Sequence, residues 1–435
     1  MMGYSLRSLC LMFVAFTVSF IAMLAILLRY PIMYGIDGPY YLIQMRHLLA
    51  EGMLKYPDPP LTYYMLAPFY SFFPDKNIGL KVAVACYGGL TSLILFMAFR
   101  RFCDLSGLTA SLTFALSPFT LRLAEDFIKN YVSLIFPATF IYVLLNVRDR
   151  RRAAIYSFII AIASALSHVL TFGVLALFSL MIFVLSLIKR SNDLAVKYAS
   201  ASAAITSAAI LTISLLILPQ ITGYDSFKLL SFLNKPFGRE GISMFRRIDF
   251  IGSIIMGLAG IIYGLTHRSK VESLIPVTSG ILLILLNFPL IGRSWLFRFS
   301  LMGSILIPLI MASIMNGVEK MSRPAMLMAI IGLMFMMMLP TIFALKPSIT
   351  MRDYFELQKI VDYVPPGSTV VVPDTRLRYW VEALHEETYD IVKRFPHTPS
   401  QNLYLIIGRH HPFRNLPPGS KIVLQGDYIR IIKIR

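Results

Sequence analysis

Residues 9–28 of the chain read LCLMFVAFTVSFIAMLAILL and contain no charged side chain. An α-helix needs about 20 apolar residues to cross the hydrocarbon core of a bilayer. The run is too long for the apolar core of a secretory signal, and it lacks a small-residue cleavage site. We therefore expect it to remain in the protein as a membrane span.

The rest of the chain has the composition of a polytopic α-helical membrane protein. Hydrophobic residues make up 57% of its 435 residues and charged residues only 15%, and its mean hydropathy is +0.68. Soluble domains carry about 25% charged residues. Apolar runs of spanning length predict about eleven transmembrane helices, at residues 9–28, 79–99, 107–120, 129–147, 153–167, 170–188, 196–218, 248–266, 272–291, 299–316 and 324–345.

The positive charge is distributed as in a membrane protein. The formal net charge is +18, which in a soluble protein would suggest a nucleic-acid partner. If the N-terminus is cytoplasmic, the basic clusters all fall on one side of the spans, which the positive-inside rule identifies as the cytoplasm. We therefore expect a location in the cell membrane and no nucleic-acid partner. The clusters lie at residues 100–101, 148–152, 189–197, 268–270 and 320–323.

This topology places the first loop, residues 29–78, and the C-terminal tail outside the cell. Within the loop, Tyr40–Glu51 is predicted to be a helix that ends at Gly52, and Leu61–Phe73 a second helix at the membrane interface. We expect residues 1–345 to form a transmembrane domain and residues 346–435 a small extracytoplasmic α/β domain. The tail should contain helices at 353–363 and 376–387 and strands at 369–372, 403–407, 421–424 and 428–434.

A lone carboxylate, Asp37, stands in the stretch MYGIDGPYYL at residues 33–42, just outside the first span. If the following residues are helical, Asp37 is the N-cap and Pro39 lies in the first turn, where its missing N–H costs nothing. Capping alone accounts for Asp37, Gly38 and Pro39. An acid held at a helix N-terminus also stays ionised, as a general base must, so the two interpretations are compatible.

A second polar group lies in SPFTLRLAEDFIKNYVSL, residues 117–134. Asp126, Lys129 and Asn130 are spaced i, i+3 and i+4, which predicts that they share one helical face at the external end of the fourth span. Taken alone, the group is best interpreted as an ion pair that anchors the helix end. The topology puts it on the same side as Asp37, however, and two acids with a cation are the groups needed to bind a hydroxyl and a phosphate.

Arg293 and Arg298 flank Trp295 in the stretch NFPLIGRSWLFRFS, residues 287–300, at the external end of the ninth and tenth spans. The guanidinium group has a fork of donors that matches a phosphate, and it stays charged beside lipid. Arginine at a helix end also often reaches the lipid headgroups. Each arginine alone fits the two interpretations about equally.

His168 stands in SALSHVLTFG, residues 164–173, in a tight external turn. We expect it to bond a backbone carbonyl at a helix end rather than a metal, because no Cys or second His stands at zinc-like spacing. The sequence contains no Walker loop and no GxGxxG, HExxH or GxSxG motif. Nucleotide hydrolysis and acyl transfer through those motifs are therefore unsupported.

The external motifs resemble those of the GT-C superfamily of membrane glycosyltransferases, which includes protein mannosyltransferases and lipid A aminoarabinose transferases. GIDGPYYLIQMRHLLAEG, residues 35–52, is similar to the acid–aromatic motif of the family, and PPLTYYMLAPFYSFF, residues 59–73, to its Pro-Pro-Leu-x-Tyr-Tyr stretch. SPFTLRLAEDFIKN, residues 117–130, is similar to its second acidic motif. A small external C-terminal domain also fits, so the resemblance covers most of the chain.

The resemblance implies a reaction and a set of site residues. The donor would be a sugar on a polyprenyl phosphate, held at the lipid bilayer, and the reaction a direct displacement at the anomeric carbon. Asp37 would be the catalytic base and Asp126 a second acid of the site. The donor phosphate would be bound by Lys129, Arg293 and Arg298, and the pocket would be lined by Tyr40, Tyr41, Asp58 and His168.

Two departures from the family pattern bear on this expectation. Oligosaccharyltransferases of the superfamily carry a Trp-Trp-Asp-Tyr-Gly motif, which this chain lacks because Trp295 and Trp380 are its only tryptophans. The departure favours transfer of a single sugar over en bloc transfer to asparagine. Gly38 stands where the family often has a second acid, so no cofactor is certain and a divalent metal remains open. The acceptor, whether a lipid, a glycan or a protein, is also open.

A transporter or a flippase of lipid-linked sugars is the alternative from another functional class, with Asp37 and Asp126 as proton or ion sites. Transporters usually hold such charges within the spans and often show internal repeats. Here the acids stand at the external ends of the spans, and we find no internal repeat, which favours an enzyme. A scaffold that binds a partner through its C-terminal domain is a third interpretation.

Overall fold

The computed structural model describes residues 6–216, 248–267, 272–289, 291–395, 402–409 and 419–434. The expected external loop 219–247 and the basic cluster 268–270 lie outside the described residues. The chain divides into two compact units. The first comprises Met1–Arg29 and Tyr56–Ala344, and the second Tyr30–Lys55 and Leu345–Arg435. The segment that contains Asp37, which we expected within the transmembrane domain, groups with the C-terminal residues.

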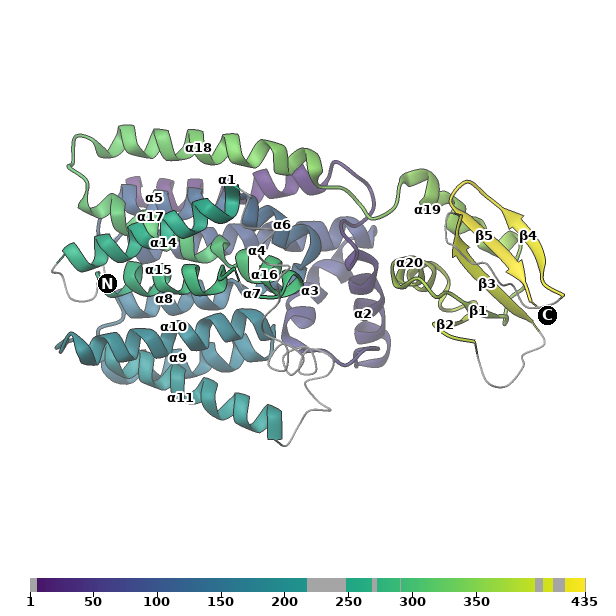
Figure 1. The fold of residues 1–435 in the computed structure, drawn as a ribbon, viewed down its shortest axis with the longest axis horizontal. Helices are drawn as coiled ribbons and strands as arrows, with labels where there is room; N and C mark the ends of the chain where they lie inside the picture. Colours follow the sequence, from purple (N-terminus) through teal and green to yellow (C-terminus); the bar gives the residue numbers. More distant parts are fainter. Residues whose placement is uncertain are drawn as a thin grey trace. The chain divides into compact units, whose positions relative to one another are not determined.

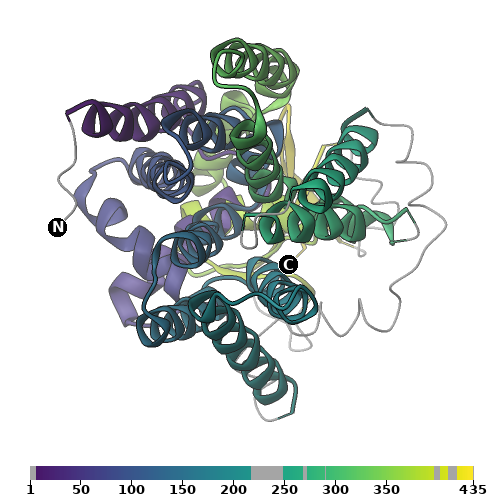
Figure 2. The same cartoon turned by 90° about the vertical axis from the view of Figure 1, so that its left-hand side faces the viewer.

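The first unit is built from helices that pack side by side (Figures 1 and 2). Its helices are α1 (Leu6–Leu27), α3 (Leu61–Phe72), α4 (Lys76–Phe99), α5 (Asp104–Ala115), α6 (Pro118–Asp126), α7 (Ile128–Ser133), α8 (Ile135–Asn146), α9 (Arg150–Ala165), α10 (Val169–Ile188), α11 (Leu194–Leu216), α14 (Ile248–Thr266), α15 (Leu274–Leu286), α16 (Arg293–Ser300), α17 (Gly303–Gly317) and α18 (Arg323–Ala344).

Seven helices among the described residues are long and apolar enough to cross a membrane. Two of them join consecutive elements, α7 with α8 and α16 with α17. The chain is therefore a multi-pass membrane protein, as its composition predicts. The remaining predicted spans correspond to α5, α9, α14 and α15, which are not among these seven helices, so the predicted number of eleven is not confirmed.

Helices α14 and α15 pack closely where Gly257 of α14 faces Gly280 of α15. A Cβ atom added to Gly280 of α15 would lie 2.3 Å from the backbone oxygen of Gly257 in α14, and one added to Gly257 would lie 2.9 Å from the oxygen of Gly280. Small residues allow the backbones of membrane helices to approach closely, which gives dispersion contacts that lipid does not supply. The crossing therefore depends on both glycines.

We expect Gly280→Ala to destabilise the first unit by about 1–3 kcal/mol, because the added methyl group would force the two backbones apart. The matched control is Gly252→Ala, because a Cβ atom at Gly252 in α14 would meet nothing within 4 Å. Thermal unfolding in detergent, followed by size-exclusion chromatography, measures the difference. Equal stability of the two variants would contradict the close crossing.

The second unit combines α2 (Gly38–Glu51) with an α/β domain formed by the tail (Figure 1). The tail contains α19 (Met351–Gln358), the 3₁₀-helix η1 (Lys359–Asp362), β1 (Thr369–Val371), α20 (Thr375–His385), β2 (Asp390–Val392), β3 (Leu403–Gly408), β4 (Lys421–Gln425) and β5 (Ile429–Lys433). Each element that the sequence predicts in the tail is present. β2 was not predicted, because its two apolar residues, Ile391 and Val392, are followed at once by Lys393 and Arg394.

The five strands form one sheet in the order β2-β1-β3-β5-β4. β1 pairs in parallel with β2 and β3, and β5 pairs antiparallel with β3 and β4. The strands contribute a small apolar core at Val371, Leu405, Ile407 and Ile432. β5 near the end of the chain thus lies inside the sheet, between β3 and β4.

His385, in the last turn of α20, is buried within the second unit. Its Nε2 atom lies 2.7 Å from the backbone oxygen of Leu357 in α19, so this nitrogen donates the hydrogen bond. Burial disfavours the charged imidazolium and lowers the pKa of His385 below its ordinary value of 6.5, and the bond to Leu357 offsets this only in part. The imidazole is therefore held neutral in the folded unit.

We expect the second unit to lose stability as the pH falls below about 6.5, because the unfolded chain then binds a proton that the folded unit resists. The lowered folded pKa means that the contribution of His385 is complete above its unfolded pKa and disappears on acidification. Fluorescence of buried Trp380 in a Trp295→Phe background should show a lower unfolding temperature at pH 5.5 than at pH 7.5. His385→Gln should reduce this difference, and an unchanged difference would contradict the assignment.

Candidate functional site

Asp37 occupies the N-cap position of α2, but its side chain makes no capping hydrogen bond. Its backbone is helical, with φ −85° and ψ −6°, whereas a capping side chain normally requires an extended backbone. Asp75, which caps α4, has that extended backbone, and its carboxylate accepts bonds from the N–H groups of Asn77 and Ile78. The prediction that Asp37 caps α2 through its side chain was therefore wrong.

The backbone around Asp37 is fixed in other ways. Gly35 has φ 65° and forms a β-bridge with Pro347, and a positive φ favours glycine. A Cβ atom at Gly38 would lie 2.7 Å from that of Met33. The glycines on both sides of Asp37 are thus explained by geometry, and the carboxylate of Asp37 is not used by the N-terminus of α2.

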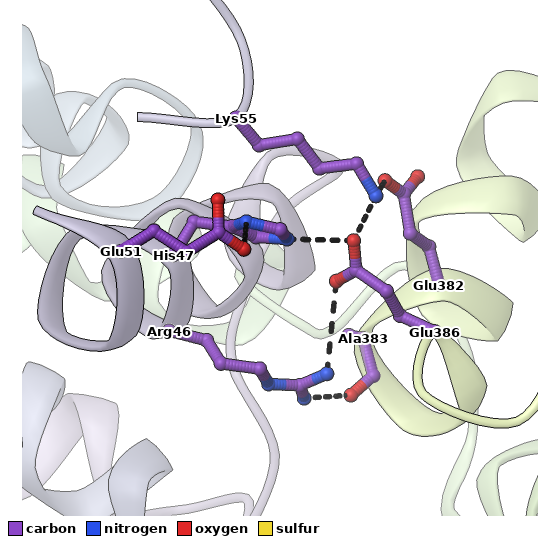
Figure 3. Close-up of polar contacts among 7 residues, drawn as sticks. All are labelled: Arg46, His47, Glu51, Lys55, Glu382, Ala383 and Glu386. Carbon is purple, nitrogen blue, oxygen red and sulfur yellow. Dashed lines mark hydrogen bonds and ion pairs between the residues drawn. The ribbon is translucent and has the colours of Figure 1, made fainter. Parts of the chain in front are cut away.

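Charged side chains fasten α2 to α20 (Figure 3). The Nε2 atom of His47 lies 2.7 Å from a carboxylate oxygen of Glu386, and its Nδ1 atom lies 2.8 Å from Glu51. Arg46 donates to the backbone oxygen of Ala383, and its guanidinium also lies 3.7 Å from Glu386. The helix that follows Asp37 is therefore held by residues more than three hundred positions later in the sequence.

Lys55 completes this network from the segment after α2 (Figure 3). Its ammonium group contacts Glu386 and lies 2.6 Å from Glu382. Burial alone would lower the pKa of Lys55, but the hydrogen bonds and charges of Glu382 and Glu386 outweigh it and raise the pKa above its ordinary value. Lys55 therefore stays charged and offsets the two acids of α20.

The two predicted pocket tyrosines of α2 have different surroundings. The ring of Tyr40 lies 5.4 Å from the ring of Tyr379 in α20, centroid to centroid, and its hydroxyl accepts a hydrogen bond from Gln44 at 3.0 Å. Tyr41 is buried. Tyr379 was missed from the sequence, because no local pattern connects residue 40 with residue 379.

In the first unit, Asp58 and Lys129 form an ion pair with an N–O distance of 2.5 Å. Their side chains are only 6% and 12% exposed, respectively. The hydroxyl of Tyr63 in α3 donates to the same carboxylate at 2.6 Å. Two residues given separate roles from the sequence, a phosphate ligand and a pocket residue, are therefore direct partners.

Asp126 and Lys129 do not share one continuous helix, as the spacing had predicted. α6 ends at Asp126 and α7 begins at Ile128, because Phe127 between them has φ −135° and ψ 58°. The i, i+3 relation fails across this break. The neighbouring Glu125, which the sequence analysis missed, is buried and accepts a hydrogen bond from Arg122 at 2.6 Å.

Arg298 of α16 lies next to the break between α6 and α7. Its guanidinium carbon is 5.6 Å from the ring centroid of Phe127 and 5.7 Å from that of Trp295. Stacking on aromatic faces orients a guanidinium and leaves its N–H edge for other partners. Arg293 is the first residue of α16, and its side chain lies outside the described part of the structure.

His168 is the N-cap of α10, where its Nδ1 atom accepts a hydrogen bond from the N–H of Leu170 at 3.1 Å. We had predicted a hydrogen bond in the opposite direction, from the His168 ring to a backbone carbonyl. Because Nδ1 accepts, the neutral ring has its proton on Nε2. The turn before His168 packs on α3, where Leu61 N–H donates to the oxygen of Leu166 at 2.9 Å.

The described residues therefore contain two groups of candidate side chains. Asp37 and Tyr40 lie in the second unit with Tyr379, and the Asp58–Lys129 pair lies in the first unit, as does Arg298. Within the described ranges, no three His, Cys, Asp or Glu side chains form a group that could hold a metal ion.

We expect Lys129→Met to destabilise the first unit by about 3–5 kcal/mol, because it leaves the Asp58 carboxylate buried without its cation. The double variant Asp58→Asn with Lys129→Met should recover part of the loss. The exposed pair Arg148–Asp193, at 3.1 Å, is the control, and Arg148→Met should cost about 1 kcal/mol or less. Thermal unfolding in detergent tests these values. A double variant less stable than Lys129→Met would contradict the pairing.

Comparison with known proteins identifies the fold. The structure of ArnT from Cupriavidus metallidurans bound to undecaprenyl phosphate is similar with a TM-score of 0.64 and 12% identity, over 98% of each chain. The apo structure of the same protein gives 0.61 and 11%, over 98% of this chain and 97% of that one. The Archaeoglobus fulgidus oligosaccharyltransferase in complex with Zn and sulfate gives 0.57 and 14%.

The similarity to the oligosaccharyltransferase covers 86% of this chain and 61% of that protein. No protein-family model and no curated protein matches the sequence. At these identities the similarity shows the fold alone, and that fold is shared with ArnT. The predicted fold class, a polytopic helical membrane protein with a small C-terminal α/β domain, is thereby confirmed.

Proposed function

We propose that the chain is a membrane glycosyltransferase that moves a single sugar from a polyprenyl phosphate to a lipid, glycan or protein acceptor on the external face of the membrane. The observation that carries the proposal is the similarity of fold, over 98% of both chains, to a protein bound to undecaprenyl phosphate. The N-terminus would be cytoplasmic, and the C-terminal domain would be external.

Asp37 is the proposed catalytic base. It would remove the proton of the acceptor hydroxyl as the oxygen attacks the anomeric carbon of the donor sugar. The constrained backbone supports this role, because the bridge from Gly35 to Pro347 and the close approach of Gly38 to Met33 hold Asp37 in one position. The bond from the anomeric carbon to the phosphate oxygen breaks in the same step, and the bonding electrons leave with the polyprenyl phosphate.

The departing phosphate gains negative charge and needs cations to stabilise it. Lys129, Arg293 and Arg298 are the proposed ligands. The ion pair with Asp58 holds the ammonium group of Lys129 in place, and the aromatic rings around Arg298 orient its guanidinium. Both cations would then be positioned before the donor binds, which avoids a cost of reorganisation during the reaction. Asp126 is the proposed second acid of the site.

We expect Asp37→Asn to reduce sugar transfer by about 100-fold or more, because the amide cannot accept the proton. The control is Glu51→Gln, which makes the same acid-to-amide change in the same helix at a side chain that is 55% exposed. Membranes containing each variant would receive a panel of tritium-labelled sugars on polyprenyl phosphate. Label in the lipid, glycan and protein fractions measures transfer.

Unchanged transfer by Asp37→Asn would overturn the assignment of the base. Movement of labelled donor across sealed vesicles without any label in an acceptor would instead support the flippase interpretation. Size-exclusion chromatography of both variants in detergent shows whether folding is retained, so that loss of the carboxylate is separated from loss of the fold.

A further inference from the structure

Two consecutive residues of α20, Arg378 and Tyr379, lie beside the segment that contains Asp37. The Tyr379 ring packs on Tyr40 with an interplanar angle of 59° and a centroid distance of 5.4 Å. The guanidinium carbon of Arg378 lies 5.3 Å from the centroid of the Tyr379 ring. All four residues belong to the second unit, so the domain formed by the tail contributes directly to the surroundings of Asp37.

The pKa of the Tyr379 phenol depends on the charged groups near it. Burial raises the pKa of Tyr379, the charge and hydrogen bond of Arg378 lower it, and the carboxylates of Asp37 and Glu382 raise it again. The geometry agrees, because Arg378 lies over the ring of Tyr379 and Tyr379 packs on Tyr40, three residues after Asp37. The negative charge of Glu382 is offset by Lys55, whose Nζ atom lies 2.6 Å from its carboxylate. Arg378 is the cation that acts on the Tyr379 hydroxyl.

Arg378 is partly exposed, but the burial of its Nε atom is not explained by the contacts between α2 and α20. Its Nε atom is buried and has no hydrogen-bond partner among the described residues, although desolvating such a donor is costly. The docking of α2 on α20 is already provided by Arg46, His47 and Lys55, which reach Glu382, Ala383 and Glu386 further along α20 (Figure 3). The protein retains the cost of desolvating this donor although the docking of α2 does not require it, and such unrelieved costs are found at functional sites.

We propose that Arg378 and Tyr379 are positioning residues for Asp37. Tyr379 would hold the first turn of α2 through its contact with Tyr40. The positive charge of Arg378 would favour the ionised form of Asp37, the form that accepts a proton. Among the described groups, Arg378 and Glu382 of α20 act with Asp37 on the Tyr379 phenol, and the ring of Tyr40 packs on that of Tyr379. The catalytic meaning of this inference rests on the proposed function, but the ionisation of Asp37 can be measured without it.

The first experiment follows the ionisation of Asp37 in the full chain, in detergent. A water-soluble carbodiimide with glycine ethyl ester labels protonated carboxyl groups, and mass spectrometry of the Asp37 peptide at a series of pH values gives a midpoint. Arg378→Ala should move the midpoint up by about one pH unit, because a nearby cation has been removed. Arg378→Lys should leave it near the wild-type value, and so should Arg376→Ala, which removes an exposed cation from the same helix.

The second experiment measures transfer kinetics, provided that the wild type transfers sugar. Arg378→Ala and Tyr379→Ala should each lower kcat by about tenfold or more, with the KM for the donor nearly unchanged, because the base is affected and donor binding is not. The acid limb of the pH profile should move upward in Arg378→Ala. Arg378→Lys and Tyr379→Phe should recover most of the activity, since they keep the charge and the ring.

The outcomes separate this inference from the proposed function. An equal midpoint in Arg378→Ala and Arg376→Ala, with Trp380 fluorescence showing both variants folded, would overturn the inference even if the protein transfers sugar. Failure of the wild type to transfer any sugar would overturn the proposed function, while a raised midpoint in Arg378→Ala would still support the electrostatic coupling. Loss of kcat that neither conservative variant recovers would also count against the positioning roles.

Discussion

The packing of α2 in the second unit depends on the ion pairs of the Glu386 carboxylate. Glu386 belongs to α20, and it contacts His47 of α2 and Lys55 in the segment after α2. An isolated helix of 14 residues is only marginally stable in water, so α2 needs packing against a partner. Ion pairs of this kind contribute less to net stability than to the choice of one arrangement over others, because desolvation opposes the attraction between the charges. Glu386 and its partners therefore determine which helix α2 packs against.

Much of the fold could be predicted from the sequence, because hydrophobic runs and turn residues act locally. Gly52 ends α2 in the left-handed conformation with φ 74°, as its position after Glu51 predicted. The strands at residues 403–408 and 429–433 follow from short runs of branched apolar residues. The grouping of residues 30–55 with the tail could not be predicted, because the partners Lys55 and Glu386 are joined only by tertiary contacts.

The candidate site shows where local reasoning fails. The spacing of Asp126 and Lys129 implies a shared face only if the helix is continuous, and the non-helical backbone of Phe127 breaks it. Asp37 had the sequence context of an N-cap, but the helical backbone at that residue directs its side chain elsewhere. Both errors concern backbone angles at a single residue, which neighbouring side chains alone do not determine. The Asp58–Lys129 pair required the packing of α3 against α7, a contact between segments 71 residues apart.

The position of β5 has a consequence for the order in which the protein can assemble. Residues 429–433 pair with β3 on one side and β4 on the other, and they are synthesised after every other described helix and strand. The segment around Asp37 is made much earlier, yet its partner α20 belongs to a domain whose sheet cannot be completed until β5 has been made. A chain cut short before β5 would keep all the described membrane helices and still lack the completed sheet of the domain that supports Asp37. Synthesis of β5 is thus a condition for assembling the surroundings of the proposed base.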